Sequence, residues 1–403
     1  MKSTPSQFLS QRVAEMPPSA TLAMSALSAS LQKQGLDILN LSAGEPDFPT
    51  PSLIIEAVQK DLASGKYFKY PPVAGYPELR EAIAHKMQQE NHLNVQPDQV
   101  IVSTGAKQSI TNALCALLNP GDEVIIFSPH WVTYPALVRL MGGVPVFAIG
   151  EAKNNYKIKP EDLEKAISAR TKAILFSSPS NPTGASFSRE ELQDLVKILL
   201  RHPKVVAISD EIYEYISFQG THTSIGSFKE IADRTLTING FSKAFAMTGW
   251  RLGYLAAPPS LAKACEKIQG QMTSGANTLA QRAGIAALKY GKKVYLPMVK
   301  AFQERRDLAI ESLEEIEGLR VPKPEGAFYL FPDFSAYLGK RYRDHVVDTV
   351  EDLSKYLLKE VQVATVHGQA FGCPHALRIS FATSETVLKD AIARIKQALA
   401  NLA

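Results

Sequence analysis

The chain has 403 residues, of which 45% are hydrophobic and 21% are charged, and its formal net charge at pH 7 is +4. This composition is typical of a globular protein, and the length suffices for sizeable cores in two domains. Neither a basic run nor an apolar stretch of transmembrane length stands out, so we expect no nucleic-acid partner and no membrane association.

Short apolar runs alternate with helical patterns over the first three quarters of the chain. The runs expected to form strands are 100–103, 123–127, 144–147, 172–176, 205–213, 235–239 and 252–256. Residues 77–90 indicate a helix that opens with a proline, which a first turn tolerates, and residues 188–191 (SREE) form a capping box before another helix. This alternation favours an α/β fold, in which helices cover both faces of a mostly parallel sheet.

The pattern changes after about residue 300. A long charged helix is followed by the apolar run 326–331 and by a terminal helix. These elements predict a smaller α+β domain at the end of the chain.

The cysteines and the first residues bear on the compartment. Cys115, Cys265 and Cys373 are widely spaced and odd in number, which suits a reducing environment. The start of the sequence shows no signal-peptide core. We therefore expect a cytoplasmic protein.

Polar side chains follow the carboxyl ends of several predicted strands. They are Asn181, Asp210, Tyr213, Lys243 and Arg251. Because ligands bind outside the carboxyl ends of strands in open α/β sheets, we expect these side chains to share one site.

Lys243 lies in the segment 239–251 (NGFSKAFAMTGWR), between two buried strands. Lysine is rarely buried without a partner, whereas a desolvated lysine is a good amine nucleophile toward a carbonyl group. Ser242 and Arg251 would add the hydroxyl and guanidinium groups that a phosphate-bearing aldehyde cofactor needs. The alternative interpretation is a surface lysine in a turn.

A strand-to-helix turn at residues 103–108 offers a second phosphate-binding element. The following helix has apolar residues at helical spacing, and its first backbone N–H groups would form an anion site favoured by the helix dipole. Gly105, Ala106 and Lys107 would hold a phosphate there. The alternative is a plain turn without a ligand.

In order and spacing, residues 177–184 (SSPSNPTG) and 239–251 resemble class I aminotransferases of pyridoxal-phosphate fold type I. The sequence is most similar to the bacterial-type aspartate aminotransferase subgroup, which includes the aspartate/prephenate aminotransferases. The resemblance runs from residues 12–21 to residues 378–384. It implies a large domain over 46–300 with a mostly parallel seven-stranded sheet, and a smaller α+β domain over 301–403, which the N-terminal segment 1–45 joins.

The resemblance also implies pyridoxal 5'-phosphate as the cofactor. Lys243 would bind it covalently and then move the substrate α-proton, while Asp210 would meet the pyridine nitrogen. The other residues implied at the cofactor are Tyr213 and Asn181 at the phenolic oxygen, Trp131 against the ring, and Gly105, Ala106, Lys107, Ser242 and Arg251 at the phosphate. Tyr70 would reach the phosphate in a neighbouring subunit, which implies a homodimer with shared active sites.

The same resemblance places the substrate. Arg378 would bind the α-carboxylate through a bidentate fork, supported by the backbone at Gly44 and by Trp131 and Asn181. Lys107, with Ser19 and Thr21, would bind a second carboxylate. We therefore expect ping-pong transfer of an amino group between L-aspartate or glutamate and 2-oxoglutarate or oxaloacetate. Prephenate also carries two carboxylates, so an aspartate/prephenate aminotransferase is the alternative.

Two other classes of function remain open from the sequence. One is another enzyme of this fold, such as an aromatic or branched-chain aminotransferase or a carbon–sulfur lyase; the other is a non-catalytic binding domain of a transcription regulator. A metal site is not expected, because His367, Cys373 and His375 match no standard zinc spacing.

Overall fold

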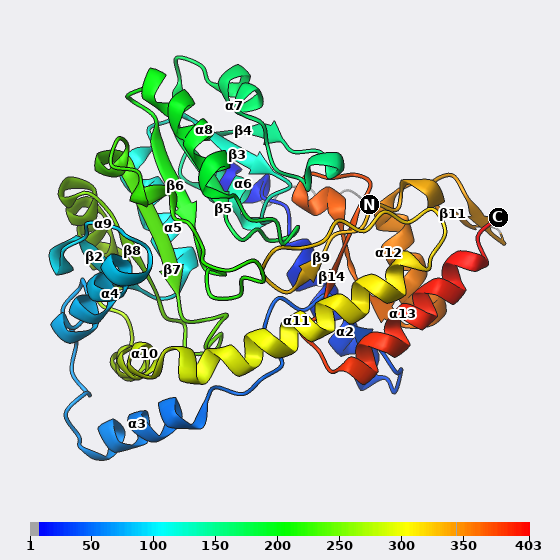
Figure 1. Cartoon of the computed structure of the whole chain (residues 1–403), viewed down its shortest axis with the longest axis horizontal. Coiled ribbons are helices and arrows are strands. Elements are labelled where there is room, and N and C mark those ends of the chain that lie inside the picture. The colour runs from blue at the N-terminus through cyan, green and yellow to red at the C-terminus, as the bar shows by residue number, and fades with distance from the viewer. Residues whose placement is uncertain (1–7, 344) are drawn as a thin grey trace.

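The computed structural model describes residues 8–343 and 345–403 (Figure 1). Within these residues, a seven-stranded sheet has the strand order β2-β8-β7-β6-β5-β3-β4. The strands are β2 (Val100–Ser103), β3 (Glu123–Ser128), β4 (Val144–Ile149), β5 (Thr171–Ser177), β6 (Val206–Asp210), β7 (Thr235–Gly240) and β8 (Gly253–Ala256). The pairings of β8 with β2 and with β7 are antiparallel, and the other pairings in this sheet are parallel. The predicted α/β fold with a mostly parallel seven-stranded sheet is confirmed.

One strand ends earlier than its apolar run. The run 205–213 was expected to be a strand throughout, but β6 stops at Asp210 and a turn follows. The Asp210 carboxylate accepts a hydrogen bond from the backbone N–H of Ile212 at 3.3 Å, a local contact that stabilises a turn. Tyr213 therefore lies in this turn rather than on the strand.

Helices cover both faces of the sheet, as the alternation predicted. They include α4 (Pro77–Glu90), α5 (Ala106–Leu117), α6 (Thr133–Leu140), α7 (Pro160–Ala166), α8 (Arg189–Arg201), α9 (Pro259–Met272) and α10 (Thr278–Tyr290), while α3 (Ser52–Ala63) packs on α10. Val124 and Ile126 of β3 pack in the core cluster that contains α5, whereas Ile125 packs in the cluster that contains α8. This alternation arises because successive strand residues point to opposite faces.

The C-terminal part forms a second layer beside the large sheet (Figure 1). Its helices are α11 (Lys292–Glu314), α12 (Val350–Val361) and α13 (Glu385–Ala400). A three-stranded antiparallel sheet joins β9 (Tyr329–Leu330), β13 (Val366–His367) and β14 (Leu377–Ser380), and β10 (Arg341–Tyr342) pairs with β11 (His345–Val346). In Figure 1, α11 (yellow) runs from beside α10 to beside α13.

The start of the described chain contacts both this C-terminal part and α6 beside the large sheet. It contains α1 (Gln11–Ala14) and α2 (Ala20–Lys33), followed by β1 (Leu39–Asn40), which pairs in parallel with β12 (Val363–Ala364). The division into 1–45, 46–300 and 301–403 stays a prediction; residues 1–7 lie outside the described residues, and α11 crosses position 300. None of the described helices combines the length and apolar character that a membrane span requires.

Candidate active site

A cavity of about 510 Å³ opens where the strand ends of the large sheet meet the N-terminal segment and β14. Strand register creates this meeting point, because Ser177 pairs with Asp210 and Gly240 pairs with Gly253. Most of the predicted site residues line it: Ser19, Thr21, Gly44, Ala106, Lys107, Trp131, Asn181, Asp210, Tyr213, Ser242, Lys243, Arg251 and Arg378. Segments distant in sequence therefore converge on one space.

One wall of the cavity suits an anion. The backbone N–H groups of Ala106 and Lys107, at the start of α5, have no hydrogen-bond acceptor within the described chain. Gly105 precedes them with φ +82°, and a Cβ there would lie 2.7 Å from Arg251 Nη2. The glycine thus lets the guanidinium approach the helix terminus, where free N–H groups and the helix dipole favour a phosphate.

Gly240, three residues before Lys243, is the last residue of β7. A Cβ on Gly240 would lie 2.9 Å from the backbone oxygen of Leu252, closer than real Cβ atoms approach. The close packing of β7 on β8 therefore leaves no room for a side chain, and the hydroxyls that this loop brings to the cavity are those of Ser242 and Thr248.

Lys243 and Asp210 face the cavity with shifted pKa values. Burial, and then the positive charge of Arg378, lowers the pKa of Lys243 to about 8. Its Nζ donates a hydrogen bond to the backbone oxygen of Gly44 at 2.5 Å. Burial raises the pKa of Asp210 to about 6, and the nearby Lys243 ammonium opposes that rise. Near neutral pH, part of Lys243 is therefore in the amine form, and Asp210 is mostly a buried carboxylate.

Sequence reasoning missed the partner of this carboxylate. The hydroxyl of Tyr134, on α6, donates a hydrogen bond to Asp210 Oδ2 at 2.7 Å. Tyr134 packs edge-on against Trp131, with ring centroids 5.5 Å apart. The sequence offers little signal for this bond, because Tyr134 and Asp210 are 76 residues apart in the chain.

Arg378 is a buried cation without an anionic partner. Its side chain is 1% exposed, and its Nη1 and Nη2 donate to Asn181 Oδ1 at 3.1 Å and to the backbone oxygen of Ser42 at 2.6 Å. Its Nε has no hydrogen-bond partner in the described residues, and no described carboxylate forms an ion pair with it. A buried charge left in this state is costly, so a carboxylate ligand is the partner that its chemistry requires.

Tyr329 is a second residue that the sequence did not reveal. Its ring lies 4.5 Å from the Arg378 guanidinium, and its hydroxyl is 2.8 Å from the hydroxyl of Tyr213. It therefore links the predicted cofactor residue Tyr213 to the predicted substrate residue Arg378.

Lys107 is another cation in the cavity lining. Lys107 Nζ lies 5.0 Å from the centre of the Trp131 ring, and burial, followed by the charge of Arg251, lowers the pKa of Lys107. Thr21 also lines the cavity, and its Oγ1 is buried without a hydrogen-bond partner in the described chain. With Ser19, these groups form a second polar end for a ligand.

Two predicted residues lie outside the cavity lining. Gly105 adjoins it as the residue before α5. Tyr70 is 92% exposed and does not line the cavity within one chain. Its predicted contact with a neighbouring subunit stays a prediction.

A possible metal cluster lies elsewhere, at Glu211, Glu214 and His222. Lys86 forms an ion pair with Glu214, and His222 Nε2 is 3.1 Å from Glu211 Oε2. Burial lowers the pKa of His222, but the two glutamates outweigh it and the pKa is raised. Lys86, together with His222 when it is protonated, can therefore balance both carboxylates without an ion. The expected absence of a metal stays a prediction.

The chain matches known proteins over nearly its whole length. The family model described as aminotransferase class I and II matches residues 36–395. A bifunctional aspartate aminotransferase and glutamate/aspartate-prephenate aminotransferase of Petunia hybrida is 46% identical over 98% of this chain and 83% of its own. The aspartate/prephenate aminotransferase of Cereibacter sphaeroides is 45% identical over 98% and 99%. The structure of Thermus thermophilus aspartate aminotransferase with maleate has a TM-score of 0.90 and 42% identity, covering 97% of this chain and 99% of that one.

Proposed function

The chain belongs to the class I and II aminotransferases, and we propose that it moves an amino group between L-aspartate or glutamate and 2-oxoglutarate or oxaloacetate. The observation that carries this substrate class is that two further cations besides Lys243 and Arg251 line the same cavity, the buried Arg378 and the exposed Lys107. A dicarboxylate offers one carboxylate to each. The maleate named with the Thermus relative is such a molecule.

The chain's residues fit pyridoxal phosphate, the cofactor of this family. When bound, the cofactor supplies an aldehyde that takes up the amino group and a ring that withdraws electrons from the α-carbon. The unpaired N–H groups of Ala106 and Lys107, with Ser242 and Arg251, would hold the phosphate. The buried carboxylate of Asp210 would keep a proton on the ring nitrogen.

The remaining residues position the substrate and move its proton. Arg378 binds the α-carboxylate and so fixes the substrate in the cavity. Lys243 removes the α-proton as a general base and returns it as a general acid, and its lowered pKa keeps part of it in the amine form near neutral pH. Tyr213, Asn181 and Trp131 would contact the ring. Two such half-reactions give ping-pong kinetics.

Lys107→Met is expected to change substrate preference. Its ammonium would make one charge-assisted bond that only dicarboxylates receive, and such bonds are worth roughly 1.5–3 kcal/mol. We therefore expect kcat/KM for aspartate to fall at least about tenfold, while kcat/KM for an aromatic amino acid holds or rises. Steady-state kinetics on both substrates give the ratio. Equal loss for both would instead mean that Lys107 serves only the phosphate, which cofactor affinity would also report.

Prephenate is the alternative acceptor, because it too carries two carboxylates and the Petunia and Cereibacter relatives are named for it. A substrate panel tests both proposals: aspartate and glutamate as donors against 2-oxoglutarate, oxaloacetate and prephenate. Conversion of prephenate with a kcat/KM near that of oxaloacetate would favour the alternative. If amino acids perturb the cofactor absorbance without any turnover, the chain is a binding domain and the proposed activity is wrong.

We also propose a homodimer with shared sites and a cytoplasmic location. The exposure of Tyr70 supports the dimer, because a tyrosine that is 92% exposed in one chain is available to a partner. The three cysteines are free, as suits a reducing compartment.

A further inference from the structure

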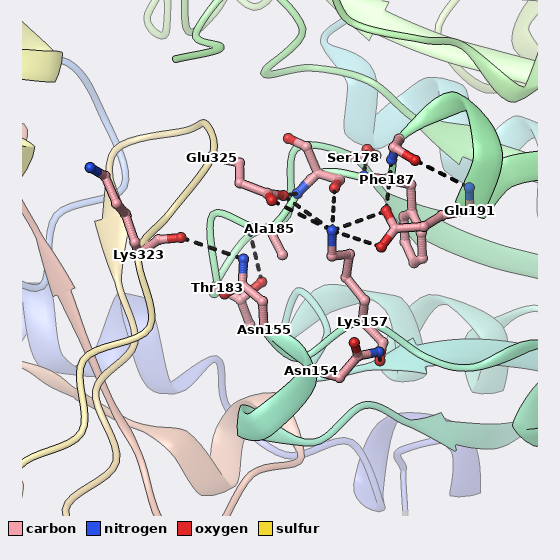
Figure 2. Close-up of polar contacts among 12 residues, drawn as sticks. Asn154, Asn155, Lys157, Ser178, Thr183, Ala185, Phe187, Glu191, Lys323 and Glu325 are labelled. Carbon is pink, nitrogen blue, oxygen red and sulfur yellow. Dashed lines mark hydrogen bonds and ion pairs between the residues drawn. The ribbon is translucent and has the colours of Figure 1, made fainter. Parts of the chain in front are cut away.

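Lys157 lies in a polar cluster that the proposed reaction does not use. It comes shortly after the 3-10 turn Ala152–Asn154 that follows β4, and only 12% of its side chain is exposed. Figure 2 shows its ammonium group between the carboxylates of Glu191 and Glu325. Lys157 lies in the connection between β4 and α7, Glu191 in α8, and Glu325 in the chain that leads into β9.

The contacts of this cluster converge on one backbone residue, Ser186. Lys157 Nζ donates to Glu191 Oε2 at 2.9 Å and to the Ser186 backbone oxygen at 3.1 Å, and it lies 3.5 Å from both carboxylate oxygens of Glu325. Glu325 Oε2 in turn accepts the Ser186 backbone N–H at 2.7 Å. Lys157 thus binds the backbone oxygen of Ser186, and Glu325 binds its backbone N–H. We call Lys157, Ser186, Glu191 and Glu325 the latch.

Ser186 belongs to a loop that is closed on itself. The N–H of Ser180 donates to the oxygen of Ala185 at 2.9 Å, and the N–H of Phe187 donates to Ser178 Oγ at 3.1 Å. Asn181 lies within this loop. Because these bonds hold the loop together, a shift of the Ser186 backbone is expected to move Asn181 with it.

The loop also fits closely against the C-terminal part of the chain. The Gly184 oxygen accepts the N–H groups of Glu325 at 2.9 Å and Gly326 at 2.8 Å. Gly184 has φ +68°, and a Cβ on it would lie 2.3 Å from Pro324 Cβ. Only glycine allows this approach. The bond from Ser186 to Glu325 in the latch, together with these backbone bonds, holds the loop against the segment that leads into β9.

Both fastened segments lead to Arg378. The loop carries Asn181, whose Oδ1 accepts Arg378 Nη1 at 3.1 Å. The other segment continues from Glu325 into β9, where the Tyr329 ring lies 4.5 Å from the same guanidinium. The orientation of Arg378 thus depends on how these segments sit against each other.

We propose that Lys157 is a positioning residue for the substrate carboxylate: through Glu325 and Ser186 it sets the geometry in which Asn181 and Tyr329 hold Arg378. This inference rests on the proposed function, since it assigns Lys157 a role in binding that substrate. Lys157 does not touch the cavity and takes no part in proton transfer. Its ammonium between two carboxylates supplies the charge that keeps the latch closed.

The test compares Lys157→Met with Lys153→Met. Lys153 is in the same turn region, but its side chain is 68% exposed and pairs only with the exposed Glu151. Because Arg378 binds the carboxylate in ground and transition states alike, Lys157→Met should raise KM for aspartate about fivefold with kcat within about twofold. The Kd for maleate, measured by calorimetry, should rise by a similar factor. Cofactor affinity should stay unchanged, and Lys153→Met should match the wild type throughout.

Two further variants keep the test decisive. Lys157→Arg retains the charge and should restore most of the maleate affinity, whereas Glu325→Gln should weaken it as Lys157→Met does. Combining Lys157→Met with Glu325→Gln should add little to either change. If Lys157→Met does not fold, the maleate Kd values of Glu325→Gln and Lys157→Arg are compared instead, and the first should be higher. An unchanged Kd and KM in variants of an active enzyme would overturn the latch proposal, even if Tm falls. A wild type inactive on every dicarboxylate would instead overturn the proposed function.

Discussion

Lys243→Ala is expected to reduce aminotransferase turnover by on the order of 10⁴-fold or more, because it removes both the covalent attachment of the cofactor and the general base. No other described lysine combines a place in this cavity with a pKa lowered to about 8. Steady-state kinetics with aspartate and 2-oxoglutarate measure the loss. The visible absorbance of the lysine-attached cofactor should disappear as well.

Cofactor binding by the phosphate-binding groups provides the internal control for this variant. The N–H groups at the start of α5 and the side chains of Ser242 and Arg251 remain in Lys243→Ala, so the cofactor should still bind without a covalent bond. Circular dichroism and Tm should match the wild type, and the exposed Lys263→Ala should retain full activity. A Lys243→Ala enzyme within tenfold of the wild-type rate would remove this lysine from the mechanism.

Asp210→Asn is expected to separate activity from stability. A carboxylate about 3 Å from a protonated ring nitrogen gains roughly 5 kcal/mol at an effective dielectric of about 20, before desolvation. Losing that interaction should slow proton transfer on the order of 10³-fold. Single-turnover kinetics with aspartate measure this step directly. A rate within tenfold of the wild type would contradict the assignment of Asp210.

In the cofactor-free protein, Asp210→Asn should reduce the loss of unfolding free energy as the pH rises. Burial raises the pKa of Asp210 from 3.8 to about 6, so the folded state holds its proton more tightly than the unfolded state does. A raised pKa stabilises the fold below the unfolded pKa, and this contribution is lost as the pH rises through about 6. The shift corresponds to roughly 3 kcal/mol at most, at about 1.4 kcal/mol per unit.

Urea unfolding at pH 5 and pH 8 tests this expectation. Between these values the cofactor-free wild type should lose more free energy of unfolding than Asp210→Asn, because asparagine does not titrate. Equal losses would show that Asp210 is not held in an unfavourable ionised state. Together, the two measurements would show that the carboxylate is kept for the cofactor and at a cost to the empty fold.

Local signals in the sequence predicted the main elements and several residues that line the cavity. The capping box at Ser188 and Glu191 starts α8 because its bonds join residues three apart, and the proline at position 77 starts α4 for a similarly local reason. Polar residues at strand ends located the cavity because parallel strands bring their carboxyl ends to one edge. The resemblance to aminotransferases added the substrate role of Lys107 and residues on distant segments: Ser19, Thr21, Gly44, Tyr70, Trp131 and Arg378.

Tertiary structure alone decided which of these residues touch one another. The bonds from Tyr134 to Asp210 and from Arg378 to Asn181 join positions far apart in the chain, and the latch at Lys157 joins three separate segments. No short-range pattern records such pairs, because they depend on strand register and on glycines, such as Gly184, that allow backbones to approach. The end of β6, by contrast, is a local feature, because the Asp210 carboxylate accepts the N–H of Ile212 only two residues later. The sequence determined the chemistry available to this protein, and packing determined its geometry, since hydrogen bonds and ion pairs form only between groups that the fold has already brought within about 3 Å.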